Sequence, residues 1–344
     1  MVNSQDLDEE YLAYLIEHIP ILGSDNYQLL NMIIDYCTAD KLGKKDIIQR
    51  INSYLNFIYK KVQQDPFENN AILNNTKNQG KINKIHKIHK ISARALIEAI
   101  INCTLKYYTQ FNMDITVNAR VNNIGNKKIH QIMSYAPGVS LAQYIINHPT
   151  NEELLNTFKN IAEILEYLQD SFGFIHGDFH QGNIFIRDDG KITIIDFGYS
   201  TIRLPLKDGY IILSCPVNEN LESEFNLDLI HNSKLKAIDL FSLFEQLKIV
   251  DVGSSSTEKI LSIENNYLIT SICKLYNLIE IKKIQEFCKT RDFLSLDLSI
   301  LYPVNFKSKE MNNIFSPLQG KRVANNNTIS GRPQKTAKSL FRTP

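Results

Sequence analysis

The 344-residue sequence predicts an α+β protein in which a small part containing a sheet is followed by a mainly helical part. Three observations carry this prediction. Residues 184–194 show a strand, a tight turn and a second strand; residues 115–135 show two further strands; and amphipathic helices lie on both sides of them. A hydrophobic content of 43% is enough for a packed core.

Residues 1–66 are predicted to form helices. Their apolar side chains recur at steps of three and four, as on a helix with one buried face. We expect Gly23 in a turn between the first two helices, and residues 65–80 indicate a polar linker or insertion. The three apolar stripes consist of Leu7, Tyr11, Tyr14 and Leu15; of Leu29, Leu30, Ile33 and Ile34; and of Ile47, Ile51, Tyr54, Leu55, Ile58 and Val62.

A basic repeat of period three occupies residues 81–91 and leads into a predicted helix over residues 93–108, in which Glu98 is the single acid. Strands are then predicted at residues 115–121 and 128–135, around a turn rich in asparagine. After these strands, Ser140 with Gln143 caps a short helix, and Thr150 with Glu153 forms a capping box on a long helix ending near residue 170. The buried face of that long helix is predicted to consist of Leu154, Phe158, Ile161, Leu165 and Leu168.

The most informative stretch is residues 174–200, where turn residues Asp188-Asp189-Gly190 separate two short strands and predict a hairpin. Pairing of the strands brings their outer ends together, so the side chains of Asp178, Asn183 and Asp196 should converge. Two carboxylates and an amide are hard oxygen ligands of the kind that Mg²⁺ prefers, and Mg²⁺ implies phosphates.

The pattern His176-x-Asp178-x-x-x-x-Asn183, followed by Asp196-Phe197-Gly198, resembles the catalytic loop and metal motif of the protein-kinase-like superfamily. Its His-Gly-Asp-x-His-x-Gly-Asn form is closer to atypical branches such as aminoglycoside and choline kinases. The resemblance implies a two-lobed protein-kinase-like fold with a small mixed amino lobe and a mainly helical carboxy lobe. The predicted divisions are a helical extension or divergent part of the amino lobe at 1–66, the amino lobe at 67–134, the carboxy lobe at 135–306 and a disordered basic tail at 307–344.

The resemblance also implies roles in catalysis. Asp178 is the expected base that orients the acceptor hydroxyl, with His180 near the γ-phosphate, and Asn183 and Asp196 are the expected Mg²⁺ ligands. Gly177 stands where protein kinases usually have arginine, so we do not expect switching by phosphorylation of an activation loop, although residues 199–233 have the length of one.

Nucleotide contacts follow from the same resemblance. Lys81 or Lys84 is expected to touch the α- and β-phosphates and to pair with Glu98; a solvated basic run is the alternative interpretation of these lysines. Met133 is expected at the back of the adenine pocket. The carbonyl of Ser134 and the amide of Ala136 are expected to contact the edge of the adenine.

Two further residues are expected to support the catalytic loop. Asp239 lies among apolar neighbours in a predicted helix over residues 237–247, and a buried acid normally needs a partner. In the family, an aspartate at this place accepts hydrogen bonds from the backbone of the catalytic loop, and His176 belongs to that loop. A pair between Glu219 and Arg291 is a further hypothesis, with ordinary surface charges as the alternative.

We therefore predict an ATP- and Mg²⁺-dependent phosphotransferase, a serine/threonine protein kinase that transfers the γ-phosphate to a hydroxyl. One alternative is a small-molecule kinase of the aminoglycoside or choline type. Another is a pseudokinase or nucleotide-binding scaffold, since no Gly-x-Gly-x-x-Gly is present. A metallohydrolase with His176, Asp178 and His180 as ligands is the third alternative. The first alternative gains from the acids after the metal motif, which are Asp208, Glu219, Glu222, Glu224 and Asp228.

The composition favours an intracellular, cytoplasmic protein. The five cysteines are widely spaced, no apolar run is long enough to cross a membrane, and the first residues are acidic. The bias toward Ile, Asn and Lys is typical of AT-rich genomes, and a large DNA virus as source would mean host cytoplasm. Residues 307–344 carry eight Lys or Arg against one acid, and we expect a solubilising tail, with contact to nucleic acid, acidic partners or a membrane surface as the alternative.

Overall fold

A computed structural model of the chain describes residues 2–23, 27–64, 84–109, 115–125, 128–147, 149–216 and 238–247. The fold is α+β and kinase-like, as expected. Its helices are α1 (Glu9–His18), α2 (Gln28–Thr38), α3 (Lys41–Gln64), α5 (Ala93–Thr109), α6 (Leu141–Ile146), α7 (Asn151–Phe172) and α9 (Ile238–Gln246). Short 3-10 turns are η1 (Ser4–Asp6) and η2 (Pro20–Gly23). Its strands are β1 (Lys84–Lys90), β2 (Ala119–Gly125), β3 (Lys128–Ser134), β4 (Val139–Ser140), β5 (Ile184–Ile186), β6 (Ile192–Ile194), β7 (Thr201–Leu206) and β8 (Gly209–Ser214).

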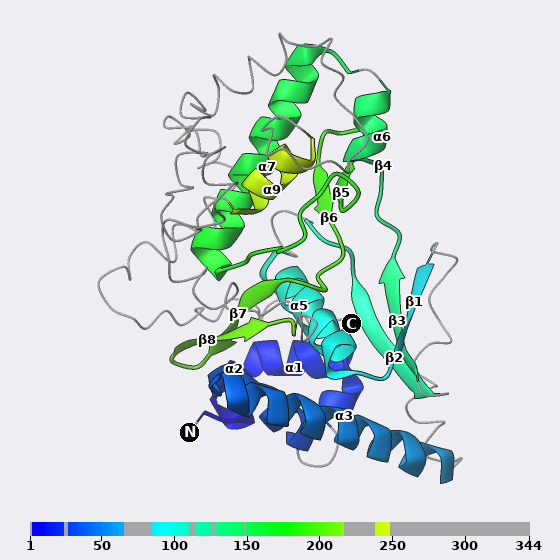
Figure 1. Cartoon of the computed structure of the whole chain (residues 1–344), viewed down its shortest axis with the longest axis vertical. Coiled ribbons are helices and arrows are strands. Elements are labelled where there is room, and N and C mark those ends of the chain that lie inside the picture. Colours follow the sequence, from blue (N-terminus) through cyan, green and yellow to red (C-terminus); the bar gives the residue numbers. More distant parts are fainter. Residues whose placement is uncertain are drawn as a thin grey trace, which may run out of the picture.

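The strands form three small antiparallel sheets, with orders β1-β3-β2, β4-β5-β6 and β7-β8. In Figure 1, α5 lies at the centre of the molecule, between the β1-β3-β2 sheet and the β7-β8 hairpin. Helices α1, α2 and α3 lie at one end, and α7 and α9 lie at the other, beside β4, β5 and β6. Helices α1 and α3, strands β2 and β3 and the β7-β8 hairpin therefore meet around α5.

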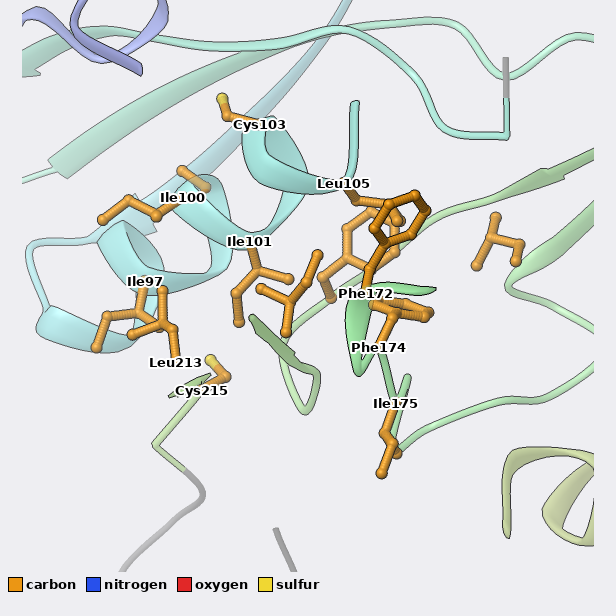
Figure 2. Packing of buried hydrophobic residues seen from close by; sticks show 14 of the residues in the cluster. Ile97, Ile100, Ile101, Cys103, Leu105, Phe172, Phe174, Ile175, Leu213 and Cys215 are labelled. Atoms are coloured by element: carbon orange, nitrogen blue, oxygen red, sulfur yellow. The ribbon is translucent and has the colours of Figure 1, made fainter. Parts of the chain in front are cut away.

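Helix α5 is buried because its apolar residues cover most of its surface instead of a single stripe. Figure 2 shows Ile97 and Ile101 close to Leu213 and Cys215, at the end of β8. The side chains of Ile97, Ile101 and Leu213 have no exposed surface. This packing fixes α5 against the hairpin that follows the predicted metal motif.

The predicted hairpin in residues 184–194 is present, with Ile184 paired to Ile194 and Ile186 paired to Ile192. Gly190 in its turn has a φ of 76°, which a residue with a side chain rarely adopts. The predicted capping box of Thr150 and Glu153 is also present at the start of α7. The whole predicted buried face of that helix is buried, from Leu154 to Leu168.

One strand differs from the prediction in its bounds, whereas the turn at Gly23 is as expected. The first strand of the pair around the asparagine-rich turn is β2, which begins at Ala119 instead of residue 115 and contains a bulge between Val121 and Asn123. The residues before β2 turn toward β6 instead, where the amide of Ile194 donates to the carbonyl of Ile115 at 2.7 Å. Gly23 lies in η2, the expected turn between the first two helices.

Several predictions fall outside the described residues. They concern the linker at 65–80, the pair of Glu219 and Arg291, and the tail at 307–344. The domain boundaries stay a prediction. Within the described ranges, no helix is both long and apolar enough to span a membrane.

Candidate active site

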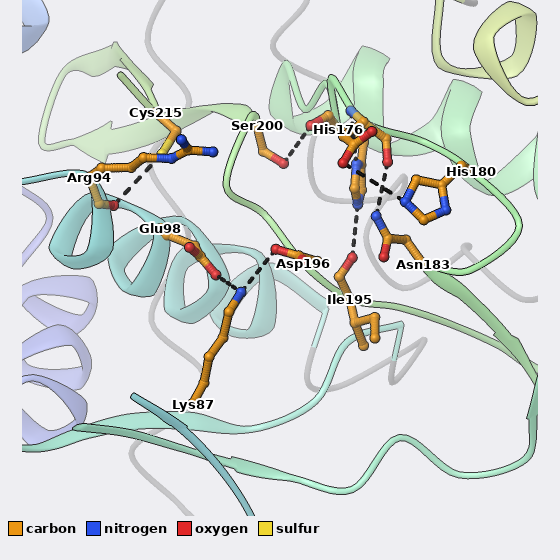
Figure 3. A network of polar contacts seen from close by, with 11 residues as sticks. Lys87, Arg94, Glu98, His176, His180, Asn183, Ile195, Asp196, Ser200 and Cys215 are labelled. Atoms are coloured by element: carbon orange, nitrogen blue, oxygen red, sulfur yellow. Dashed lines mark hydrogen bonds and ion pairs between the residues drawn. The ribbon is translucent and has the colours of Figure 1, made fainter. Parts of the chain in front are cut away.

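Lys87 of β1 joins two acids from distant parts of the chain. Its Nζ lies 2.5 Å from Oε1 of Glu98 on α5 and 2.9 Å from Oδ1 of Asp196, two residues after β6. Figure 3 shows the lysine side chain extending from β1 between the two carboxylates. The Glu98 side chain is only 7% exposed, whereas that of Asp196 is 48% exposed. The triad of Lys87, Glu98 and Asp196 is therefore buried at Glu98 and open to solvent at Asp196.

The charges of this triad stabilise one another. Partial burial opposes the charge on Lys87, but Glu98 and Asp196 outweigh it and raise the pKa of the ammonium. Partial burial also opposes the charge on Asp196, but the hydrogen bond and charge of Lys87 outweigh it and lower the pKa of that carboxyl. The site therefore holds one cation beside a solvent-facing carboxylate at neutral pH.

Asp239 of α9 holds the start of the predicted catalytic loop, at residues 176–177. Its Oδ2 accepts from the amide of His176 at 2.7 Å, and its Oδ1 accepts from the amide of Gly177 at 2.9 Å. Burial raises the pKa of Asp239, while His176 and the two amides act in the opposite direction. The backbone contact expected for Asp239 is therefore present, and its importance for catalysis stays a prediction.

The ring of His176 is a structural link, with no exposed surface. Its Nε2 lies 2.9 Å from the carbonyl oxygen of Ile195, and its Nδ1 lies 3.3 Å from the amide of Asp178. A carbonyl only accepts and an amide N–H only donates, so the ring is neutral with its hydrogen on Nε2. Burial lowers the pKa of His176, which agrees with the neutral form. Both ring nitrogens are thus engaged, which speaks against His176 as a metal ligand.

Gly177 adopts a φ of 78°, and a Cβ there would collide with the carbonyl oxygen of Tyr199. An arginine is therefore excluded at this position by backbone geometry. This gives a physical reason for the missing arginine noted in the sequence.

Asn183 directly precedes β5 and Asp196 lies two residues after β6, so both follow from the pairing of these strands, and Figure 3 shows the Asp196 carboxylate turned toward Lys87. The Nδ2 of Asn183 donates to the carbonyl of Asp178 at 3.0 Å. This hydrogen bond does not use the Oδ1 of Asn183, which can act as an acceptor. The amide of Ile195 donates to the carbonyl of Asn183 at 3.1 Å and ties the two strand ends. Asp196 itself has a φ of 68°, an unusual backbone state for a residue with a side chain.

Asp178 and His180 lie on the open side of the loop. The Asp178 side chain is 42% exposed, and its Oδ2 lies 3.9 Å from Nε2 of His180, beyond hydrogen-bond distance. The amide of Gly182 donates to Nδ1 of His180 at 3.0 Å, so a neutral ring carries its hydrogen on Nε2, toward Asp178. The Asp178 carboxylate thus faces solvent, with a ring N–H nearby.

The lysine that pairs with Glu98 corrects the sequence analysis. That lysine is Lys87, whereas Lys84 is the first residue of β1 and Lys81 lies outside the described residues. Every third residue of the repeat is a lysine, so the sequence pattern offered no way to choose among them.

The residues expected at the adenine lie at the end of β3 and just beyond it. Met133 and Ser134 close the strand, opposite Ile85 and Lys84 of β1, and Ala136 is buried in the following connection. No contact of the described residues tests their predicted role.

Arg94 is a site residue that the sequence analysis missed. Its guanidinium lies 4.6 Å from the ring centroid of Tyr199, and a side chain at Gly198 would come within 3.3 Å of its Nη2. Its position one turn before Glu98 on the same helix is the signal that could have indicated it.

Parts of the chain are similar in sequence to known phosphotransferases and kinases. Residues 132–236 match the model of the phosphotransferase enzyme family. Sperm motility kinase Tcr mutant form of Mus musculus is 36% identical over 81 residues, which is 23% of this chain and 16% of that protein. Serine/threonine-protein kinase rio2 of Dictyostelium discoideum is 39% identical over 69 residues, which is 19% of this chain and 12% of that protein.

The fold and the comparisons show that the chain is similar to phosphotransferases and kinases. The resemblance to the protein-kinase-like superfamily, in an atypical form, is confirmed. The matched part spans 11% of maternal embryonic leucine zipper kinase of Xenopus laevis, 36% identical over 74 residues, so similarity to each of these relatives is confined to a small part of its length.

Proposed function

We propose that the chain is an ATP- and Mg²⁺-dependent kinase that transfers the γ-phosphate to a hydroxyl group. The observation that carries this proposal is the contact of Lys87 with both Glu98 and Asp196. This contact joins the ammonium of Lys87, on β1, to Asp196, which follows β6. In kinases, such a lysine contacts the nucleotide phosphates, the glutamate pairs with the lysine, and the aspartate holds the metal.

Asn183 and Asp196 fit the requirements of a Mg²⁺ site. Both offer oxygen donors at the joined ends of β5 and β6, and the hydrogen bond of Asn183 to Asp178 orients its Oδ1 away from that partner. When bound, the ion offsets negative charge on the β- and γ-phosphates. Lys87 provides a second, permanent positive charge for the phosphates.

Asp178 is the proposed base. Its exposed carboxylate can accept the proton of an acceptor hydroxyl, and its backbone is fixed on both sides, by His176 and by Asn183. Asp239 and the neutral ring of His176 hold the loop in position without taking part in the proton transfer. His180 is proposed to assist at the γ-phosphate, and Met133, Ser134 and Ala136 to line the adenine site.

We propose protein serine or threonine as the acceptor, because several similar proteins are named as kinases and one is named as a serine/threonine-protein kinase. A small-molecule hydroxyl is the second candidate, favoured by the match to the phosphotransferase enzyme family. The intact triad of Lys87, Glu98 and Asp196 argues against a scaffold without activity. A cytoplasmic location remains part of the proposal.

The test is transfer from radiolabelled ATP with Mg²⁺ to a panel of proteins and a panel of small alcohols and aminoglycosides. Wild type is compared with Asp178→Ala and with the control Asp188→Ala, which changes an exposed acid in the β5–β6 turn. We expect transfer by wild type and the control, and a loss of about 10²–10⁴-fold in Asp178→Ala. Equal activity of all three proteins would refute the proposed role of Asp178, and the panel that is labelled identifies the acceptor class.

A further inference from the structure

The position of Glu98 depends on helix α5, and the first turn of α5 is capped from another helix. The amide of Ala93 donates to Oδ1 of Asn52, on α3, at 2.7 Å. The first amides of a helix lack partners within the helix, and asparagine is among the best residues at satisfying them. Ser92, directly before α5, satisfies a second amide of the first turn: its Oγ accepts from the amide of Ala95 at 3.2 Å.

A second contact holds the middle of α5. The hydroxyl of Tyr11, on α1, lies 2.7 Å from Oγ1 of Thr104, and neither residue has exposed surface. Thr104 donates its own hydrogen to the carbonyl of Ile100, so the Tyr11 hydroxyl is the donor in this pair. Removal of the Tyr11 hydroxyl therefore removes a buried link between the two helices.

We infer that Asn52 is a positioning residue, and that α1 and α3 form a built-in clamp that holds Glu98 against Lys87. Glu98 lies five residues after Ala93, about 7.5 Å along the helix, so a shift at the capped end moves the carboxylate away from the ammonium. The position of Glu98 beside Lys87 is then set by contacts within the chain. This inference rests on the proposed function for its effect on ATP.

The experiment compares Asn52→Ala with Asn52→Asp, which keeps the accepting oxygen, and with the control Asn56→Ala. Asn56 lies one turn further along α3, and its side-chain amide donates to the carbonyl of Asn52 at 2.8 Å. Two quantities are measured on the full chain: hydrogen exchange of the α5 amides without nucleotide, and kcat and KM for ATP.

We expect Asn52→Ala to speed exchange in the first turn of α5 and to raise KM for ATP, each by about fivefold, as for loss of a typical asparagine cap. Asn52→Asp should restore both values, because a carboxylate oxygen also accepts and suits the amino end of a helix. A general loss of stability would instead speed exchange throughout the protein and leave KM unchanged.

The inference is overturned if Asn52→Ala and Asn56→Ala behave alike in both measurements, or if Asn52→Asp is as impaired as Asn52→Ala. Should Asn52→Ala not fold, Tyr11→Phe carries the same test at the other contact, with the same expected local exchange and rise in KM. A wild type without phosphotransfer would refute the proposed function, while exchange would still decide whether Asn52 holds α5.

Discussion

Lys87 and Asp196 are separated by 109 positions in the sequence, yet the lysine Nζ lies 2.9 Å from Oδ1 of the aspartate. The same ammonium also reaches Glu98, so a single cation serves one buried and one exposed acid. An unpaired Glu98 would be costly at its depth, because a buried charge without a partner loses its solvation. The two ion pairs of Lys87 therefore hold β1, α5 and the end of β6 close to one another.

Replacement of Lys87 tests this arrangement. We expect Lys87→Ala to raise KM for ATP at least tenfold and to lower thermal stability, because Glu98 is left without its cation. The matched control is Lys90→Ala, at the exposed end of the same strand. Kinetics with varied ATP and a melting curve of each protein measure the effect, and a Lys90→Ala variant that is equally impaired would contradict it.

Asp196 and Asp178 should separate binding from chemistry. We expect Asp196→Ala to lose turnover together with nucleotide affinity in Mg²⁺, because a proposed metal ligand is removed. Asp178→Ala should still bind ATP while it loses turnover. Calorimetric titration with a non-hydrolysable ATP analogue and Mg²⁺ checks both variants. Weak binding by Asp178→Ala with full binding by Asp196→Ala would reverse the two assignments.

Gly177 should be far less replaceable than another glycine with nearly the same backbone angle. Gly177 and Gly190 have φ of 78° and 76°, but only Gly177 faces a backbone oxygen, while a Cβ at Gly190 meets nothing within 4 Å. We expect Gly190→Ala to cost about 1 kcal/mol and Gly177→Ala about 3 kcal/mol or more. Urea denaturation gives both values, and equal costs would show that the backbone at Tyr199 yields.

His176 should make stability depend on pH in a definite direction. Its pKa is lowered by burial, so below about pH 6.5 the unfolded chain binds a proton that the folded chain does not. This contribution is complete above about pH 6.5 and is lost as the pH falls toward the folded pKa, by up to about 1.4 kcal/mol per unit.

The variants His176→Gln and His130→Gln test this dependence. Glutamine at 176 can still donate to Ile195 but does not titrate, and His130 is a control on β3. The difference between the urea midpoints at pH 7.5 and 5.5 should be smaller for His176→Gln than for wild type and the control. An unchanged pH dependence in His176→Gln would contradict the prediction.

Local patterns in the sequence were sufficient for part of this site. The β5–β6 hairpin follows from alternating isoleucines and a strong turn, and the need of Asp239 for partners follows from its apolar neighbours. The hairpin depends on residues close in sequence, and the need of Asp239 for partners depends on its neighbours along the helix. Both can therefore be predicted from the sequence.

Other features depend on tertiary register. The lysine repeat gives Lys84, Lys87 and Lys90 nearly the same neighbours, and the pairing of β1 with β3, which sets Lys87 opposite Gln131, distinguishes them. Helix capping by Asn52 depends on how α3 packs against α5, which no local pattern records. The β7–β8 hairpin was not predicted, although Asp208-Gly209 between apolar alternations is a turn signal that could have indicated it.

This hairpin has a consequence for control of the protein. Thr201 of β7 and Ile175 exchange backbone hydrogen bonds of 2.8 and 3.0 Å. At the end of β8, the carbonyl of Ser214 accepts from the hydroxyl of Tyr36. A hairpin fastened at both Thr201 and Ser214 is not free to swing at that end. If the chain is the proposed kinase, we therefore expect its activity not to depend on movement of residues 201–214.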